Sequence, residues 1–197
     1  MNVLSGEASS ESNDSQGLAG QFLIGLPSLG GDYFKHSLSL LIEHDEAGAF
    51  ALMLNRPLDL TLQDLFDMPA PAHTHVPVLE GGPVQPESAF FLHRGNEHYE
   101  ASLAIPLASG ERIQLTTSDD LLEDLSTGDG PTALLAVVGY AGWGPGQLEA
   151  ELSENIWLIT PADSHIIFET PYEKRASAAA GAMGIDINLM SSHPGHG

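Results

Sequence analysis

The sequence has no cysteine, which excludes disulfide bonds and thiolate chemistry together. It has only six lysines and arginines against 27 aspartates and glutamates, so its formal net charge is −21 with neutral histidines. A surface of this charge repels nucleic-acid phosphates and anionic membranes, because binding to either draws on cationic side chains. We therefore expect no direct nucleic-acid binding and no membrane binding. The acidity itself fits either a saline cytoplasm or a basic partner.

Long hydrophobic runs are also missing. No apolar run approaches the roughly 18 residues that a membrane-spanning helix requires, and residues 1–7 lack the basic and apolar regions of a secretory signal. With 197 residues and 42% apolar content, the chain can bury the core of a single domain. We expect a soluble cytoplasmic protein with a disordered tail over residues 1–17 and one domain over residues 18–197.

The most informative stretch is the glycine-rich segment from Gly139 to Gly146. An apolar run over residues 133–138 precedes it, and a segment with helical apolar spacing follows. The pattern predicts a strand, a glycine-rich turn and a helix that begins near Pro145. Four glycines around Trp143 indicate a backbone that passes close to something, either a ligand or a neighbouring strand.

Phosphate-binding signatures are absent from this turn. It lacks the Gly-Lys-Ser/Thr ending of a P-loop, and the spacing Gly142-x-Gly144-x-Gly146 is not that of the dinucleotide fingerprint. No lysine or arginine occurs between Arg112 and Lys174, so a phosphate would meet an acidic neighbourhood with only backbone amides to hold it. Two interpretations stay open: a tight turn that packs Trp143 into the core, or a ligand pocket lined by the turn.

Further apolar patterns predict many strands and a few short helices. We expect strands at 21–26, 37–44, 49–54, 88–94, 101–105, 112–116, 156–160 and 165–168, with strand or extended chain at 185–190. Short helices are expected at 61–66, 119–125 and 171–182, with a capping box from Thr61 to Asp64 and a cap at Ser118. Because strands and helices do not alternate regularly, the fold class is α+β, a single domain with a largely antiparallel sheet.

Few residue patterns in the sequence indicate catalysis or metal binding. His73 and His75 lie in a proline-rich loop without the further ligands that a metal site needs. Ser37 and His44 stand at opposite ends of one predicted strand, roughly 23 Å apart, so they do not form a nucleophile–base pair. His93 with either partner stays open, without a Gly-x-Ser-x-Gly elbow to support it. We expect no catalytic residue, no metal and no cofactor, and lean against an enzyme.

A series of motifs extends over most of the chain. In order they are Phe34-x-x-Ser37, His44, Gly48-Ala49, Asn55-Arg56-Pro57, Gly81-Gly82-Pro83-Val84, Phe91-Leu92-His93, Leu115-Thr116-Thr117-Ser118-x-Asp120, GYAGWGPGQLEAEL at 139–152, Asn155-Ile156-Trp157-Leu158 and Gly195-His196. Over about residues 20–196 this series resembles the AlgH/YqgE family of bacterial proteins. The resemblance implies an α+β domain whose sheet curls into a partly closed barrel flanked by short helices.

One departure from the family is visible near the last helix. Where the family usually has an aromatic residue near the helix start, as Trp-x-x-Ala, this chain has Arg175-Ala176-Ser177. The departure puts the packing of that helix in doubt and leaves the membership intact.

The family is described as regulatory, from a proposed role in alginate regulation, and no reaction is attached to it. The resemblance therefore implies a transcription-associated regulator or adaptor that binds a protein partner or a small ligand rather than DNA. The alternative is a hydrolase-type enzyme or a small-anion-binding protein that uses the glycine-rich turns with Arg56, His93 and Ser37.

A functional surface, if the chain has one, is expected where loops follow predicted strands. Its members would be Asn55, Arg56, Gly81, Gly82, Pro83, His93, Gly142, Trp143, Gly144 and Gln147. Arg56 is the residue expected to bind an anionic group, because its planar guanidinium pairs with carboxylates in a bidentate manner. The competing hypothesis makes Arg56 an internal clamp and Trp143 a core residue.

Overall fold

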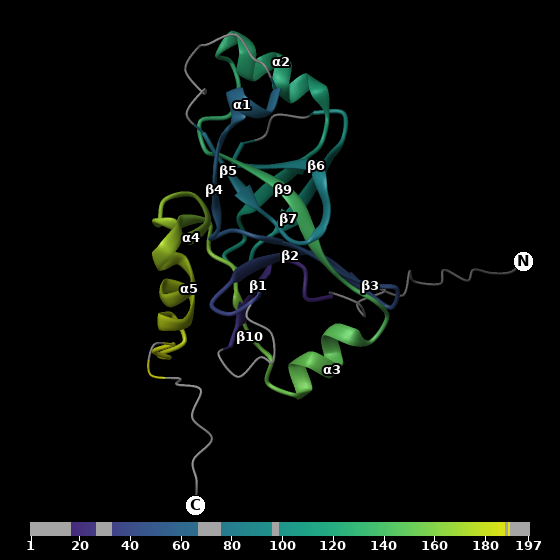
Figure 1. Ribbon diagram of the computed structural model, residues 1–197, viewed down its shortest axis with the longest axis vertical. Coiled ribbons are helices and arrows are strands. Elements are labelled where there is room, and N and C mark those ends of the chain that lie inside the picture. The colour runs from purple at the N-terminus through teal and green to yellow at the C-terminus, as the bar shows by residue number, and fades with distance from the viewer. Residues whose placement is uncertain (1–16, 27–32, 67–75, 96–98, 188, 190–197) are drawn as a thin grey trace, which may run out of the picture.

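The computed structural model describes residues 17–26, 33–66, 76–95, 99–187 and 189. Within them, ten strands form one sheet with five short helices around it (Figure 1), which confirms the predicted single α+β domain. The sheet curls without closing. The predicted tail, apart from Gly17, lies outside the described residues, as do His73, His75 and the Gly195-His196 ending.

The elements follow one another along the chain in a fixed order. The strands are β1 (Gln21–Gly25), β2 (Leu38–Asp45), β3 (Gly48–Met53), β4 (Pro57–Thr61), β5 (Pro77–Glu80), β6 (Val84–His93), β7 (Ser102–Pro106), β8 (Arg112–Thr116), β9 (Leu134–Trp143) and β10 (Trp157–Pro161). The helices are α1 (Leu62–Phe66), α2 (Asp119–Thr127), α3 (Gln147–Ser153), α4 (Ser164–Phe168) and α5 (Tyr172–Gly181).

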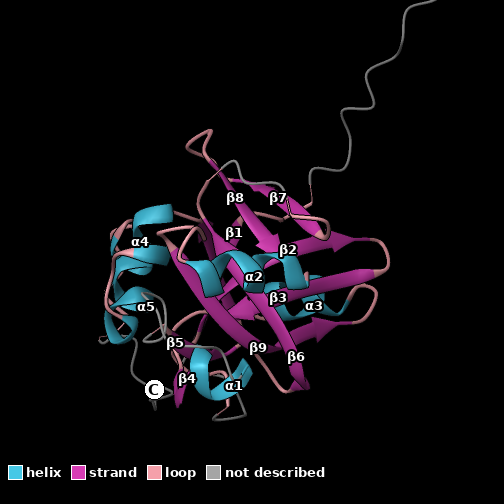
Figure 2. Ribbon diagram, turned by 90° about the horizontal axis from the view of Figure 1, so that it is seen from above, coloured by secondary structure: helices cyan, strands magenta, loops and turns pink. Residues whose placement is uncertain are grey.

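The sheet is antiparallel at all but one of its strand pairs. Its order is β10-β1-β2-β3-β9-β6-β8-β7, and the β4–β5 pair joins it through a parallel contact between β5 and β9. The hairpin predicted from residues 37–54 forms as β2 and β3. Helices α1 and α2 lie at one end of the molecule and α3 at the other (Figure 1), while α4 and α5 lie together along one side (Figure 2).

Core clusters lie on both faces of the sheet at its central strands, which explains why several of these strands read as continuous apolar runs. Along β2, Leu38, Leu40 and Ile42 join the largest core cluster, together with residues of α4 and α5. Leu41 points to the other face and joins a cluster under α3. A third cluster lies under α1 and α2.

The structure of the glycine-rich stretch differs from the prediction. Residues 139–143 were expected to form a turn, but β9 continues through them to Trp143 and pairs with β3, Ala49 opposite Trp143 and Ala51 opposite Ala141. Gly139 has φ 70° within this strand. Pairing with β3 outweighs the low strand preference of glycine, because tertiary context decides strand formation more than propensity does.

Three further segments differ from the predictions. Residues 165–168 form helix α4 instead of a strand, because Asp163 caps the helix by accepting the His165 N–H at 2.7 Å. The β4 strand was not predicted; its ends pair with β5, Pro57 with Leu79 and Thr61 with Pro77. No strand forms in the described part of 185–190.

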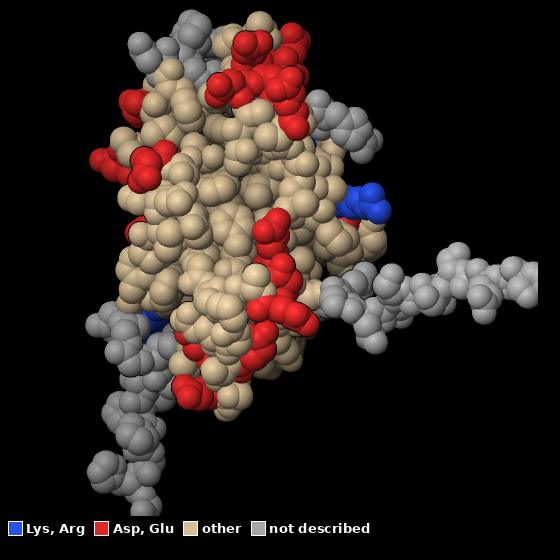
Figure 3. All heavy atoms as spheres, turned by 90° about the vertical axis from the view of Figure 1, so that its right-hand side faces the viewer, with Lys and Arg blue, Asp and Glu red and all other residues tan. Residues whose placement is uncertain are grey.

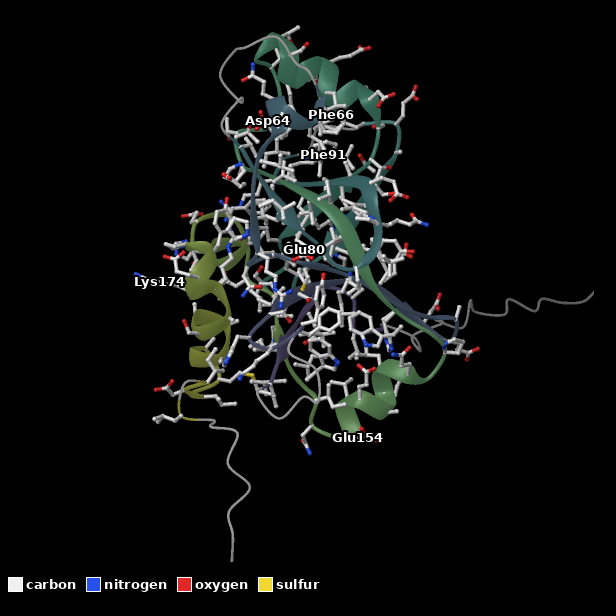
Figure 4. The ribbon with its side chains drawn as sticks, in the orientation of Figure 1. Asp64, Phe66, Glu80, Phe91, Glu154 and Lys174 are labelled. Carbon is white, nitrogen blue, oxygen red and sulfur yellow. The ribbon has the colours of Figure 1, made fainter. Side chains whose placement is uncertain are left out.

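The two predicted helix caps have different outcomes. Asp64 Oδ2 accepts both the Thr61 N–H at 2.8 Å and the Thr61 hydroxyl at 2.7 Å, which confirms the predicted capping contact between Thr61 and Asp64 (Asp64 is labelled in Figure 4). These bonds lower the pKa of Asp64 from its ordinary value. Ser118 occupies the predicted N-cap position of α2 but accepts no backbone N–H of the helix through its side chain; its hydroxyl donates to the Asp120 carboxylate. No helix in the described residues is long and apolar enough to cross a membrane.

Candidate functional site

The predicted site residues fall into three places. Asn55 and Arg56 lie at the junction of β3 and β4, next to the Gly81-Gly82 segment after β5. Trp143 and Gln147 lie where β9 meets α3, and His93 is buried at the end of β6. The strands bring Asn55 and Arg56 together with the Gly81-Gly82-Pro83 segment, whereas His93 and the residues around Trp143 lie apart from it.

Asn55 completes the backbone bonding at the start of β2. Its Oδ1 accepts the Leu38 N–H at 2.9 Å, and its Nδ2 donates to the His36 carbonyl at 2.8 Å. The neighbouring Leu54 N–H donates to the Leu38 carbonyl at 2.8 Å. The amide side chain therefore extends the β2–β3 pairing past the last strand residue, into the turn where His36 has φ 57°.

Arg56 belongs to a polar cluster with Tyr33 and Glu80, which we call the strand-end cluster. Arg56 Nη1 lies 3.7 Å from Glu80 Oε2, and its guanidinium lies 4.7 Å from the centre of the Tyr33 ring. The Tyr33 hydroxyl donates to Glu80 Oε1 at 2.6 Å. Glu80, labelled in Figure 4, lies near the middle of the long axis of the molecule. The Arg56 side chain keeps 27% of its surface exposed, so the cluster is open to solvent on one side.

A second arginine reaches the same junction and was not among the predicted site residues. Arg175 on α5 is 2% exposed; it donates from Nη1 to the Leu54 carbonyl and from Nε to the Thr170 carbonyl at 3.0 Å. Its guanidinium also lies 4.3 Å from the centre of the Tyr172 ring. Burial lowers the pKa of Arg175 to about 10, which leaves it charged at neutral pH. Arg175, which stands where the sequence departs from the family pattern, therefore connects the last helix to the sheet.

Gly81 and Gly82 allow a close backbone crossing. A Cβ on Gly81 would lie 2.2 Å from the Gly139 carbonyl oxygen, and one on Gly82 would lie 2.1 Å from the Tyr140 carbonyl carbon. The Gly81 carbonyl accepts the Met53 N–H at 2.9 Å, and the Gly81 N–H donates to the Val138 carbonyl at 2.8 Å. Gly139 is one of the glycines around Trp143 for which a ligand or a neighbouring strand was possible, and at Gly139 these contacts favour the neighbouring strand. Pro83 follows, exposed, before β6.

Trp143 is a core residue anchored by one carboxylate. Its indole N–H donates to Glu151 Oε2 at 2.8 Å, and the Trp157 indole N–H donates to the same oxygen at 2.7 Å. Gln147 donates to Glu151 Oε1 at 2.8 Å and accepts the Gly144 N–H at 3.1 Å. The polar atoms of this group bond mainly to one another. Gly142, on the preceding strand segment, is exposed opposite Phe50.

His93 lies in a buried polar network at the end of β6. Its Nε2 lies 3.0 Å from Thr116 Oγ1, which lies 2.7 Å from Ser102 Oγ, and its ring meets the edge of Tyr99. Within the described residues, no group of three or more histidine, aspartate and glutamate side chains is arranged to hold a metal ion.

The molecule is a single-domain α+β protein whose curled, largely antiparallel sheet carries core clusters on both faces. The chain belongs to the AlgH-like family, whose model matches residues 22–188.

Known relatives agree with this assignment. A UPF0301 protein of Cupriavidus metallidurans is 45% identical over 184 residues, which covers 91% of this chain and 95% of the relative. The solution structure of the AlgH protein from Pseudomonas aeruginosa is similar with a TM-score of 0.75 and 38% identity, over 97% of this chain and 100% of that one. A Corynebacterium diphtheriae protein of known structure shares the fold, with a TM-score of 0.67 and 19% identity over 91% of this chain and 94% of its own.

The two arginines at the β3–β4 junction should differ in their effect on stability. Arg56→Ala removes a solvent-open ion pair with a 3.7 Å separation, so the free energy of unfolding should fall by no more than about 1 kcal/mol. Arg175→Ala leaves two carbonyls without their charged donor, one of them buried, and should cost roughly 3 kcal/mol. Urea unfolding of both variants measures the difference. Equal losses would mean that Arg56 is also a buried clamp.

The Tyr33 hydroxyl should lose its proton at a higher pH than an ordinary tyrosine. Burial, and then its bond to the Glu80 carboxylate, raise the pKa of Tyr33 to about 12 from its ordinary value of 10.0. Because the folded state holds this proton more tightly, the stability that Tyr33 contributes is complete below pH 10 and declines between pH 10 and 12. Relative to wild type, Tyr33→Phe should therefore show a smaller loss of stability over that interval. Parallel losses in both proteins would refute this assignment.

Proposed function

We propose that this protein is a regulatory or adaptor-type protein that acts by binding a protein partner with basic side chains, without direct contact to nucleic acid and without catalysis. Its cytoplasmic location is part of the same proposal. The main support for the proposal is that half of the basic side chains are bonded within the fold, while most of the acidic side chains are exposed.

Half of the six basic side chains are engaged within the fold. Arg175 is buried on carbonyls and Arg56 faces Glu80. Arg94 donates to Glu169 at 2.9 Å and to Ser164 at 3.0 Å, and lies 3.2 Å from Glu111. Little cationic surface is left for phosphates, although nucleic-acid binding draws most of its affinity from such contacts.

Most of the carboxylates, in contrast, are exposed. Among the described residues no aspartate or glutamate is buried. Figure 3 shows acidic side chains gathered at the end of the molecule that carries α2 and in a band along the half that carries α3. Exposed acids at these places include Asp119 and Glu123 on α2, Glu149 on α3 and Glu154 after it. Such a surface attracts a basic partner and speeds its association.

The hydrolase alternative receives less support from the geometry. The Ser37 hydroxyl donates to the Phe34 carbonyl at 2.7 Å, while His93 bonds to Thr116. In the strand order, β2, which follows Ser37, and β6, which carries His93, are separated by β3 and β9. Ser37 and His93 are both buried. This arrangement favours a binding role over nucleophilic catalysis, which needs the base within hydrogen-bond reach of the nucleophile.

The alternative of a small-anion-binding protein is also less supported, because of the surroundings of Arg56. The guanidinium already faces the Glu80 carboxylate and the Tyr33 ring, so an anion would have to compete with Glu80 for it. A protein partner that meets the exposed carboxylates needs no such displacement.

Fluorescence anisotropy with labelled duplex DNA at low salt tests the first half of the proposal. We expect no binding tighter than about 1 µM, because cationic contacts are scarce. Submicromolar binding that weakens steeply with added salt would contradict the proposal.

Capture from native cell extract on the immobilised full-length chain tests the second half. A specific protein partner should be retained at low salt and released as salt rises, because screening weakens charge pairing. The variant Asp119→Asn/Glu123→Gln serves as a charge-neutralised comparison on α2, and Glu149→Gln/Glu154→Gln as the matched comparison at α3. Retention of nothing beyond what a blank matrix retains would refute the proposal.

A further inference from the structure

The β7 strand forms an edge of the sheet. It stands last in the strand order, and within the described residues β8 is the only strand paired with it, from Ser102 opposite Thr116 to Pro106 opposite Arg112. Residues 102–104 are all exposed. An edge strand presents unpaired backbone donors and acceptors on its outer side, and proteins either protect that side or use it for binding.

The outward-facing groups of β7 can be identified from the ladder. The Thr117 N–H donates to the Ala101 carbonyl at 3.1 Å, and the Leu107 N–H donates to the Glu111 carbonyl at 2.9 Å, so residues 101 and 107 bond toward β8. Since bonding alternates along an antiparallel strand, residues 103 and 105 also face β8, while Ser102 and Ala104 direct their N–H and C=O groups outward.

The position of Gly20 agrees with the outward direction of alternate β7 backbone groups, and Gly20 covers one end of the edge. A Cβ on Gly20 would lie 2.1 Å from the Pro106 carbonyl oxygen, so the Pro106 carbonyl also points away from β8 and the chain at Gly20 covers it. Proline at this end offers no N–H to a neighbour. The open part of the edge is therefore limited to Ser102, Leu103 and Ala104.

A groove of about 670 Å³ runs beside this edge. Its walls are the first described residues 17–21, the end of β2 over 42–45, and residues 103, 104 and 106–108 of the edge region. Leu103 lies on the same face of β7 as the buried Ile105 but is 39% exposed. An apolar position that continues the core row is thus left uncovered at the groove.

The charged residues around the groove are of one sign. Glu43 and Asp45 line it and are exposed, while no lysine or arginine is among the described residues that line it. His44, also in the wall, accepts the Leu18 N–H at Nδ1 (3.1 Å), and its Nε2 lies 2.8 Å from Glu149 Oε1. Arg112 lies opposite Pro106, at the closed end of the edge.

We propose that the open edge of β7 binds an extended segment of a protein partner as an added strand. The segment pairs with the outward N–H and C=O groups of Ser102 and Ala104, places an apolar side chain on Leu103, and sets lysine or arginine beside Glu43 and Asp45. This inference rests on the proposed function and specifies the partner: an extended apolar–basic segment, recognised through its backbone and its alternating side chains.

Phage-displayed random peptides, panned on the full-length protein, provide the probe. Ala104→Pro removes an outward N–H without removing a bond to β8, so the fold should persist, and circular dichroism checks this. Ala104→Val keeps the N–H and is its matched control. Glu43→Gln/Asp45→Asn removes the acids of the groove. Asp59→Asn on β4 with Glu173→Gln on α5, both exposed and outside the surfaces named above, controls for the same change in net charge.

Selected peptides should alternate apolar and basic residues and shift the backbone amide signals of residues 102–104. Ala104→Pro should weaken their binding about tenfold, since a strand bond is lost, while Ala104→Val leaves it unchanged. The groove charge variant should weaken binding severalfold, and the Asp59→Asn/Glu173→Gln variant should not. Peptides that bind Ala104→Pro as tightly as wild type, or a selection that yields no such peptide, would overturn the inference. A partner captured from extract that still binds Ala104→Pro would refute this edge alone and leave the proposed function standing.

Discussion

The fold depends on one close crossing of backbones, where Gly81 and Gly82 pass over Gly139 and Tyr140. No side chain fits there, because a Cβ on any of the three glycines would lie within 2.5 Å of an atom on the opposite segment. The crossing joins β5 to β9, holds β3 through the Met53–Gly81 bond, and lets β9 bend from one half of the sheet into the other. Two cores can then form on opposite faces of a single strand.

The same crossing fixes the positions of the polar groups. Glu80 immediately precedes it, so the strand-end cluster of Tyr33, Arg56 and Glu80 is assembled at its side. The long β9 strand is also the element from which the sheet curls both ways, toward β3 in one direction and β6 in the other. That curl places the outer edge of β7 beside the end of β2, where the groove lies. The acidic exterior surrounds a fold in which Arg175 is a buried clamp, while Arg56 and Arg94 pair with carboxylates at partly exposed positions.

Sequence patterns predicted most of this fold and less of the site. Strands with clear alternation or long apolar runs were found, and so was the Thr61–Asp64 capping contact, because these signals are local. The course of β9 through its glycines, and helix α4, depended on distant pairing and on the Asp163 cap, which apolar periodicity does not report. Glycines that serve a close strand crossing look the same in sequence as glycines that approach a ligand. Arg175 was noticed as a departure, but its clamp on Leu54 spans 121 positions of the chain.

The most direct test of the crossing is the free energy of unfolding of Gly139→Ala compared with Gly144→Ala. Gly139 has φ 70°, and a Cβ added to it would lie 2.5 Å from the Gly82 carbonyl oxygen, whereas the nearest atom to a Cβ on Gly144 is the Gln147 side-chain oxygen at 4.0 Å. We predict a loss of at least about 3 kcal/mol for Gly139→Ala, and a change within about 0.5 kcal/mol for Gly144→Ala. Similar small changes in both variants would contradict the claim that the crossing holds the fold together.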